Sequence, residues 1–185
     1  LSEWYFEKFA TDESSTEGLF EDYDHPNTRV THMTVDHELP MTFWRSVGHS
    51  YTAFAKESMI DEMAEAAGMD EVAFRLQNTQ NTPRLNNVIR VAGEHMAKMN
   101  PPEGHHLGFA AHHSFYTDVA EIAEVSVENG KIRVHKVTCV LDCGQAVNPD
   151  IVRSQIEGGV IYGLTATLYG GLNLERGAIK ESNFH

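Results

Sequence analysis

Residues 142–164, DCGQAVNPDIVRSQIEGGVIYGL, combine the end of an apolar run, an Asn-Pro pair and an apolar segment that contains three glycines. Asn148 is a favourable N-cap residue, and Pro149 suits the first turn of a helix because proline lacks the amide hydrogen that this turn leaves unpaired. The sequence therefore predicts a strand that ends near Asp142, a short turn, and a helix over roughly residues 149–169.

The glycines of this predicted helix are unfavourable on local grounds, since each costs about 1 kcal/mol relative to alanine. They are Gly158, Gly159 and Gly163. Glycine is useful where a second backbone or a flat ligand must approach more closely than a Cβ atom permits. We expect the glycines to form such a close-approach surface, either for packing or for a ligand.

Upstream of this stretch the sequence predicts β-structure. The segments LGFAAHHSFYTDVAEIAEVSV (107–127) and KIRVHKVTCVL (131–141) are rich in β-branched residues and alternate between apolar and polar positions. The Asn-Gly pair at residues 129–130 is a strong signal for a two-residue hairpin turn between them. A second, terminal hairpin is predicted to turn near the Arg-Gly pair at residues 176–177.

Residues 50–100 are predicted to be helical. Ser50 is placed to cap a first helix and Gly68 to end it, Asp70 can cap a short second helix, and a Thr-Pro pair at residues 82–83 marks the start of a third. The predicted apolar stripes are Tyr51, Phe54, Met59, Ile60, Met63, Ala64 and Ala67 in the first helix, and Leu85, Val88, Ile89, Ala92, Met96 and Met99 in the third.

The first forty residues are polar and include the acidic, serine-rich segment TDESSTEGLFEDYDHPN (11–27). We expect a surface loop or extended arm there, without a chemical role. The patterns together predict an α+β protein in which helices pack on a mixed or antiparallel sheet. We divide it into an irregular arm over 1–40, an arginine-containing turn and helical segment over 41–104, and a hairpin, glycine-containing helix and terminal hairpin over 105–185.

Charge and composition argue against several classes of partner. The chain has 14 basic and 27 acidic residues and a net charge of -13, which opposes binding to nucleic acid and anionic lipid. No apolar run approaches the ~18 residues of a membrane span. Cys139 and Cys143 lie four apart in a predicted strand, where a disulfide is seldom possible, and no cysteine metal site is indicated.

A set of residues spread over the strand end, the turn and the helix follows the pattern Asp-x-Gly, Asn-Pro, Gln, Glu-Gly-Gly and Gly. They are Asp142, Gly144, Asn148, Pro149, Gln155, Glu157, Gly158, Gly159 and Gly163. This pattern resembles the molybdenum-binding subunit of the xanthine dehydrogenase/aldehyde oxidase family. A second block, WRSVGHSYTAFAKESMIDEMAEAAGMDEVAFRLQN (44–78), resembles the family segment in which an arginine-containing turn precedes a helix. Its WRSVGHS opening is most similar to the isoquinoline 1-oxidoreductase beta-subunit branch, and the resemblance covers roughly residues 18–185.

The resemblance implies that the chain is part of a molybdopterin-binding lobe. The implied cofactor is a molybdenum-bearing molybdopterin, often the cytosine dinucleotide form in bacteria. The implied reaction is hydroxylation, with oxygen from water, of an aldehyde carbon or of a carbon beside nitrogen in an N-heteroaromatic ring. Electrons would leave through 2Fe-2S clusters on a separate small iron-sulfur subunit. The substrate's identity, and a cytoplasmic or periplasmic location, stay open.

The resemblance also implies site residues. Arg45 matches the arginine of the turn that approaches the molybdenum, and Gln155 matches the glutamine that contacts the pterin. Arg45 offers a planar fork of donors, and Gln155 offers an amide donor and acceptor. Gly48, Gly144 and Asn148 complete the implied cofactor-binding positions, and no side chain is expected to bind the metal directly. The helix start at Asn148 would also attract a phosphate.

The family's catalytic base is a glutamate in a Gly-x-Gly-Glu context near the carboxyl end. Nothing after Gly177 matches it, and Glu181 has different surroundings. We therefore expect no catalytic residue in this chain and place the base beyond His185. On this interpretation the chain is a piece of a longer polypeptide and is inactive alone.

Two other functions stay open on the sequence. The chain has 11 histidines, including adjacent pairs at 105–106 and 112–113, which suggests a metal-dependent hydrolase. Adjacent strand residues point to opposite faces, however, so His112 and His113 do not readily share one ion. The second alternative is a non-catalytic interaction module on the same fold.

Overall fold

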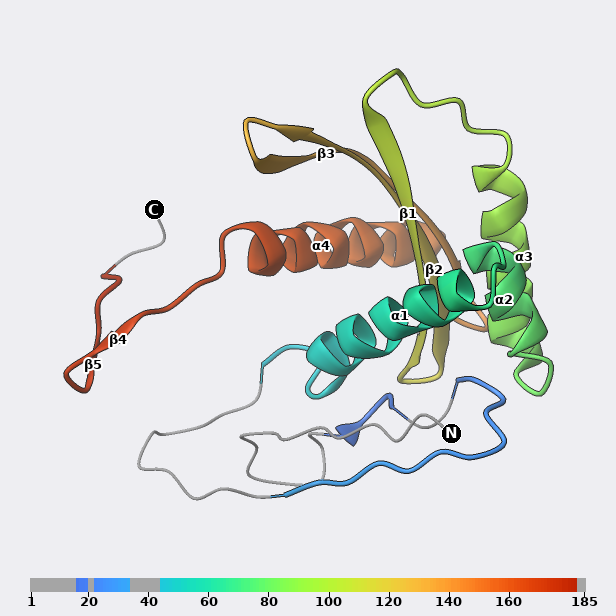
Figure 1. The fold of residues 1–185 in the computed structure, drawn as a ribbon, viewed down its shortest axis with the longest axis horizontal. Helices are drawn as coiled ribbons and strands as arrows, with labels where there is room; N and C mark the ends of the chain where they lie inside the picture. The colour runs from blue at the N-terminus through green and yellow to red at the C-terminus, as the bar shows by residue number, and fades with distance from the viewer. Residues whose placement is uncertain (1–15, 20–21, 34–43, 183–185) are drawn as a thin grey trace. The chain divides into compact units, whose positions relative to one another are not determined.

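The computed structural model describes residues 16–19, 22–33 and 44–182. Its helices and strands confirm the predicted α+β class (Figure 1). In chain order they are α1 (His49–Ala66), α2 (Glu71–Gln77), α3 (Pro83–Met96), β1 (His105–Ser114), β2 (Thr117–Glu128), β3 (Lys131–Asp142), α4 (Pro149–Leu168), β4 (Leu174–Glu175) and β5 (Ala178–Ile179).

The chain divides into two compact units. The first contains the described residues up to Ser126 together with Val134–Gly144, and so holds α1, α2, α3 and most of the sheet. The second contains Val127–Arg133 and the described residues from Gln145 onward, and so holds α4 with the small β4–β5 hairpin. The predicted division into the segments 1–40, 41–104 and 105–185 stays a prediction.

The larger sheet has the strand order β1-β2-β3, and β1 pairs antiparallel with β2. The 107–127 segment was expected as one alternating stretch, but a tight turn divides it into β1 and β2. Phe115 and Tyr116 form this turn with φ of 46° and 64°. The turn escapes prediction because it uses two aromatic residues where Gly, Asn or Asp is usual.

Both hairpin turns that the sequence predicts are confirmed. Asn129 and Gly130 have φ of 53° and 74°, and Arg176 and Gly177 have φ of 53° and 79°. Positive φ at both central residues is the geometry of the hairpin turn that matches strand twist.

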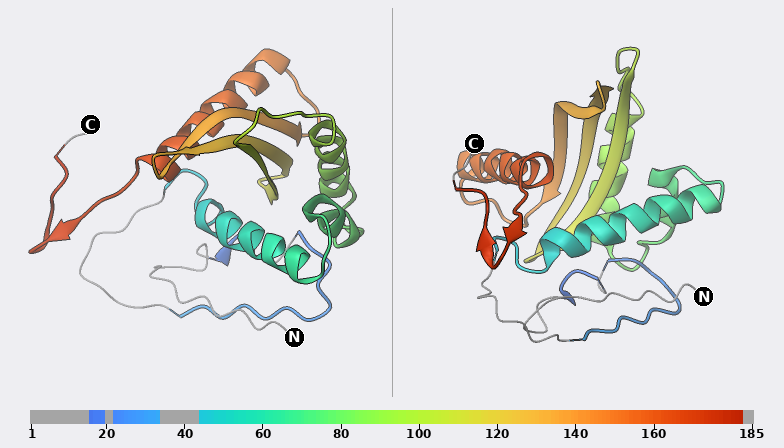
Figure 2. Two further views of the ribbon diagram at one scale, coloured as in Figure 1. Left: turned by 45° about the horizontal axis from the view of Figure 1, so that its top comes forward. Right: turned by 60° about the vertical axis from the view of Figure 1, so that its left-hand side comes forward.

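The main core lies between α3 and one face of β1 and β2 (Figure 2). The predicted stripe of α3 is confirmed for its four buried members, which face paired positions on the two strands, whereas Met96 is partly buried and Met99 packs against the core after the helix has ended. Fully burying one such aliphatic side chain stabilises the fold by roughly 1.5–3 kcal/mol. The buried residues are Leu85, Val88, Ile89, Ala92, Phe109, Ala111, Ala120 and Ile122.

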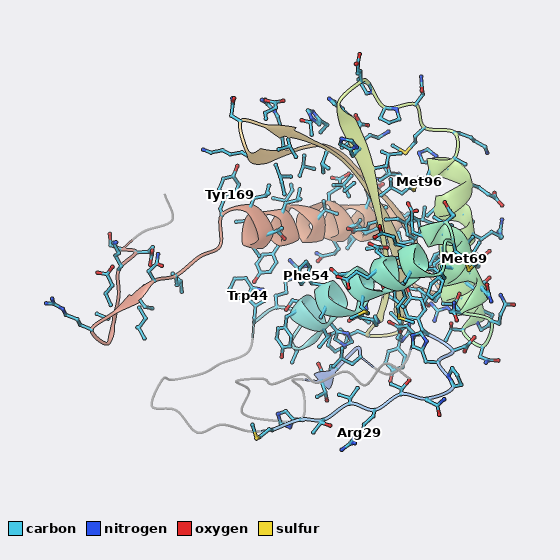
Figure 3. All side chains as sticks on the ribbon, in the orientation of Figure 1. Arg29, Trp44, Phe54, Met69, Met96 and Tyr169 are labelled. Carbon is cyan, nitrogen blue, oxygen red and sulfur yellow. The ribbon has the colours of Figure 1, made fainter. Side chains whose placement is uncertain are left out.

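The predicted stripe of α1 is only partly right. Ile60 and Ala64 are buried, but Tyr51 and Phe54 are 42% and 76% exposed (Phe54 is labelled in Figure 3). The helix instead buries polar residues, namely Thr52, Lys56 and Glu57. Helical periodicity of apolar residues could not reveal this face, because its side chains are buried through hydrogen bonds and ion pairs.

The ends of the helices agree with local chemistry in most places. Asp70 caps α2, since its Oδ1 accepts from the amides of Val72 and Ala73 at 3.0 and 2.9 Å. Gly68, with φ of 64°, follows the end of α1 as predicted. Ser50 does not cap α1, because the helix begins at His49 and Ser50 already lies inside it, where its hydroxyl donates to the Val47 carbonyl.

Cys139 and Cys143 are free thiols, as expected. Over the described ranges, the helices include none with the length and apolar character needed to cross a bilayer.

Candidate functional site

The predicted molybdenum-side arginine, Arg45, lies on an exposed turn directly before α1. The turn is closed by a hydrogen bond from the Val47 amide to the Trp44 carbonyl, 2.9 Å. Gly48, predicted at the same site, is buried at the end of the turn, and its carbonyl accepts from the Thr52 amide at 3.1 Å. Arg45 and Gly48 therefore lie in the same turn, in which Arg45 is exposed and Gly48 is buried.

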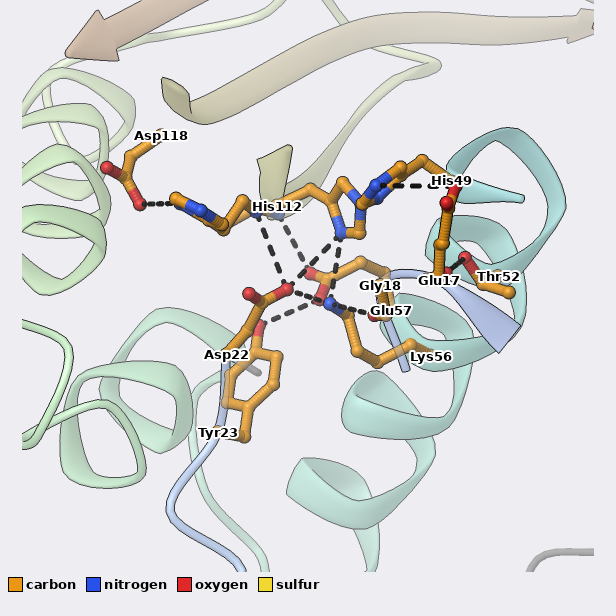
Figure 4. Close-up of polar contacts among 12 residues, drawn as sticks. Glu17, Gly18, Asp22, Tyr23, His49, Thr52, Lys56, Glu57, His112 and Asp118 are labelled. Atoms are coloured by element: carbon orange, nitrogen blue, oxygen red, sulfur yellow. Dashed lines mark hydrogen bonds and ion pairs between the residues drawn. The ribbon is translucent and has the colours of Figure 1, made fainter. Parts of the chain in front are cut away.

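Beneath this turn lies a buried network of charged and polar side chains, shown in Figure 4. Lys56 is at its centre: its Nζ forms an ion pair with Asp22 and donates to the Gly18 carbonyl at 2.8 Å. His112 lies with Nδ1 3.0 Å from the same ammonium and Nε2 2.9 Å from His49 Nδ1. Asp22 is 1% exposed, so the expectation that this segment lies on the surface is wrong at this residue.

A second buried group adjoins the first. Glu57 accepts hydrogen bonds from Arg75 Nε at 3.0 Å, from the Tyr23 hydroxyl at 2.8 Å and from the Ala111 amide at 2.8 Å. Arg75 is fully buried and also pairs with Asp61 at 2.7 Å. Since β1 is at the end of the sheet, the Glu57 carboxylate satisfies an amide that this strand leaves unpaired.

The network changes the protonation of its members. Burial, followed by the positive charge of Lys56, lowers the pKa of His112 to about 3, so the imidazole is neutral at physiological pH. Burial and the neighbouring Glu57 carboxylate raise the pKa of Tyr23, which keeps its hydroxyl protonated as a donor. Burial opposes the charge of Arg75, but the carboxylates of Glu57 and Asp61 outweigh it and raise the pKa of the guanidinium. The buried network therefore consists of ion pairs that surround one neutral imidazole, that of His112.

Two larger cavities flank this network, besides one of about 60 Å³ that Tyr23 and Lys56 help to line. One, of about 270 Å³, is lined by Asp22, His113, Asp118 and the first residues of α3. The other, of about 380 Å³, lies between α1 and the strands and is lined by residues that include Phe54, Glu57 and His112. Arg45, the predicted cofactor-side arginine, is not among the residues that line these cavities.

The Asp-x-Gly part of the motif has a clear structural role. The Asp142 carboxylate accepts from Arg84 Nε at 3.1 Å and from Arg84 Nη2 at 3.0 Å, and its Oδ1 also accepts from the Gly144 amide at 2.8 Å. Gly144 has a φ of 71°, in the left-handed region that glycine adopts readily because it has no Cβ atom. These hydrogen bonds, with the Arg84 guanidinium first, lower the pKa of Asp142. The predicted Gly144 site is therefore a turn that Asp142 and Arg84 hold at the end of β3.

In the second unit, Asn148 caps α4 as predicted. Its Oδ1 accepts from the amides of Asp150 and Ile151 at 3.1 and 3.2 Å. Because those two amides are already paired and Asp150 adds a negative charge, this helix start offers little to a phosphate. Asn148 thus has a structural role, and its predicted contact with the cofactor stays a prediction.

Gln155, the predicted pterin contact, is exposed in the first half of α4. Its side chain makes no hydrogen bond with the part of the chain that the structure describes, so both its amide donor and its acceptor can serve a ligand. No residue of α4 is buried. At Gly158, Gly159 and Gly163, an added Cβ would have no described atom within 4 Å, so the surface expected to approach these glycines is not formed by the described residues.

The histidines that the structure describes do not assemble a metal centre. Among the residues that the structure describes, no three His, Cys, Asp or Glu side chains lie close enough to hold a metal ion. His113 pairs with Asp118 at 2.9 Å, whereas His112 belongs to the Lys56 network, so the adjacent histidines have separate partners. The hydrolase alternative therefore has no geometric support.

Comparison with known proteins defines the class. Residues 41–185 match the molybdopterin cofactor-binding domain, and the chain belongs to this family, within the xanthine dehydrogenase/aldehyde oxidase group that the motifs predicted. It is 31% identical to the isoquinoline 1-oxidoreductase beta subunit of Brevundimonas diminuta, over 98% of this chain and 24% of the relative. It is 29% identical to a nicotinate dehydrogenase subunit of Pseudomonas putida, over 85% of this chain and 15% of the relative.

A third relative, at 26% identity over 76% of this chain and 21% of its own length, is the membrane-bound aldehyde dehydrogenase [pyrroloquinoline-quinone] of Gluconacetobacter polyoxogenes. The chain thus spans about a quarter or less of these curated relatives, all of them bacterial oxidoreductases. The family match includes every predicted site residue, but it begins at residue 41 and so does not include Gly18 and Asp22. Sequence patterns missed these two, because their partners lie more than thirty positions away in the chain.

Proposed function

We propose that this chain is part of the molybdopterin-binding subunit of an oxidoreductase that hydroxylates an N-heteroaromatic or aldehyde carbon with oxygen from water. The main support is the exposed Arg45 turn within a chain that belongs to the molybdopterin cofactor-binding domain family. Two relatives are named for isoquinoline and nicotinate chemistry, which favours an N-heteroaromatic substrate, and a third is named for aldehydes.

The described residues fit the cofactor in their chemistry. Arg45 is exposed in the first unit and offers a planar cationic fork, and Gln155 is exposed in the second and offers an amide with donor and acceptor. When bound, the molybdopterin would supply the oxo-transfer and redox chemistry. Arg45 would hold and orient the metal side of the cofactor, and Gln155 would hydrogen-bond to the edge of the pterin. We assign the cytosine dinucleotide form, and electron transfer to 2Fe-2S clusters on a small partner subunit, as part of the same proposal.

The test uses the intact subunit with its partner. Gln155→Ala should lower molybdenum content or turnover several-fold without unfolding the protein, whereas Arg45→Lys should lower kcat more than molybdenum content, since an ammonium cannot reproduce the planar fork. Thr167→Ala on α4 and Arg90→Lys on α3, both exposed, are matched controls. Full molybdenum loading and full activity in both variants would remove the residue assignments. Purified intact protein without molybdenum would instead favour the non-catalytic module.

A further inference from the structure

The turn that carries Arg45 has an unfavourable backbone. Ser46 and Val47 have φ of 74° and 50°, in the left-handed region that residues with a Cβ atom rarely adopt. A β-branched residue such as Val47 is especially disfavoured there. A conformation of this kind persists only where its surroundings determine it, so the contacts that hold this turn are of functional interest.

The first of these contacts is made by Thr52, which is fully buried in α1. Its hydroxyl oxygen lies 2.9 Å from the Gly48 carbonyl oxygen and 2.5 Å from the Glu17 carbonyl oxygen. A hydroxyl has one hydrogen, so it donates to one of these carbonyls at a time. Thr52 thereby connects the end of the Arg45 turn to a segment more than thirty residues earlier in the chain.

The second contact is made by Gly18, in that same early segment. Its φ is 78°, and a Cβ at this position would lie 2.7 Å from His49 Nδ1 and 2.8 Å from His112 Cε1. Its carbonyl accepts from Lys56 Nζ at 2.8 Å. Only glycine allows the backbone to lie this close to both imidazoles, directly beside the first turns of α1 (Figure 4).

We propose that residues 16–19, which we call the positioning segment, hold the Arg45 turn in its left-handed conformation. Gly18 and Thr52 are then positioning residues that act through the turn and touch no substrate. The inference rests on the proposed role of Arg45 at the cofactor, and it extends that site to residues outside the 41–185 family match.

The experiment compares two glycine substitutions in the intact holoenzyme. Gly18→Ala introduces both the positive-φ penalty and the contact with the histidines, whereas Gly68→Ala introduces a positive-φ penalty at the other end of α1 with nothing within 4 Å of the new Cβ. We expect Gly18→Ala to accelerate amide hydrogen exchange in residues 44–52 and to lower kcat roughly tenfold or more at unchanged KM and molybdenum content. Gly68→Ala should change neither the exchange of these residues nor kcat.

A second pair of variants, at Thr52, tests the same proposal if Gly18→Ala folds poorly. Thr52→Ser keeps the hydroxyl and should retain slow exchange in residues 44–52, while Thr52→Val removes it at similar volume and should accelerate exchange there. The proposal is overturned if Gly18→Ala and Gly68→Ala behave alike, or if Thr52→Val exchanges like Thr52→Ser. Because amide exchange can be measured and compared among the variants with or without the cofactor, a protein without molybdenum would refute the proposed function and still give a result for the positioning segment.

Discussion

Arg84 at the start of α3 and Asp142 at the end of β3 form a two-point ion pair, with Nε and Nη2 lying 3.1 and 3.0 Å from the carboxylate oxygens. Arg84 Nη2 also donates to the Asp142 carbonyl at 2.9 Å. One arginine therefore fixes the residue at which the family motif begins, 58 positions later in the chain.

The Arg84–Asp142 pair should make stability depend on pH in the acid range. The folded state lowers the pKa of Asp142 below its ordinary value of 3.8, so its contribution is present above that pH and is lost as the pH falls below it. Asp142→Asn should therefore lower the urea midpoint of the 185-residue chain at pH 7 more than at pH 3. Glu103→Gln, in an exposed loop, is the control. An equal loss at both pH values would contradict the assignment.

The Glu57–Arg75 pair should be the most sensitive part of the network. Glu57→Gln leaves the fully buried Arg75 with Asp61 as its remaining carboxylate, and removing one partner of a buried pair is strongly destabilising. We expect the free energy of unfolding to fall by about 3 kcal/mol. Urea denaturation measures this, with the exposed Glu62→Gln on the same helix as the control. A change as small as that of the control would show that the pair contributes little.

His112 should impose a pH dependence of its own. The unfolded chain protonates this histidine near its ordinary pKa of 6.5, whereas the folded chain does so only at about 3. Its contribution is therefore full above pH 6.5 and is lost progressively as the pH falls toward 3, by up to about 1.4 kcal/mol per pH unit.

The matching experiment measures unfolding between pH 7.5 and 5. His112→Asn should flatten the decline seen in the unmodified chain, while the exposed His95→Gln should retain it. An unchanged slope in His112→Asn would mean that another group controls the acid sensitivity of the network.

The glycines of α4 give a prediction whose sign depends on context. Because nothing described lies within 4 Å of a Cβ at Gly159, Gly159→Ala should stabilise the isolated chain by about 1 kcal/mol through helix propensity. Thermal unfolding of the isolated chain and of the intact subunit measures both cases. If the rest of the subunit or its cofactor approaches this helix closely, the same substitution should lower the melting temperature of the intact protein. Stabilisation in both would make Gly159 an ordinary surface position.

The cap of α2 at Asp70, the cap of α4 at Asn148 and the turn at residues 129–130 were all predictable, because each depends on residues within a few positions of one another. The stripe of α3 was predictable for a similar reason, since one apolar face at helical spacing has few ways to be buried. The motif that begins at Asp142 likewise revealed the family without any knowledge of its contacts.

Only the tertiary structure could show which polar residues become core. Lys56 is an ordinary helix residue in the sequence, and it is buried because the chain places Asp22, Gly18 and His112 around its ammonium group. These partners lie 34 to 56 positions away, and no local preference favours their meeting. Burying a charge is unfavourable unless its partners are brought to it, and that condition belongs to the folded chain as a whole. Arg45 was singled out by a sequence motif, and its role at the cofactor stays a prediction, whereas the contacts of Thr52 and Gly18 with residues beside its turn became visible only in the folded chain.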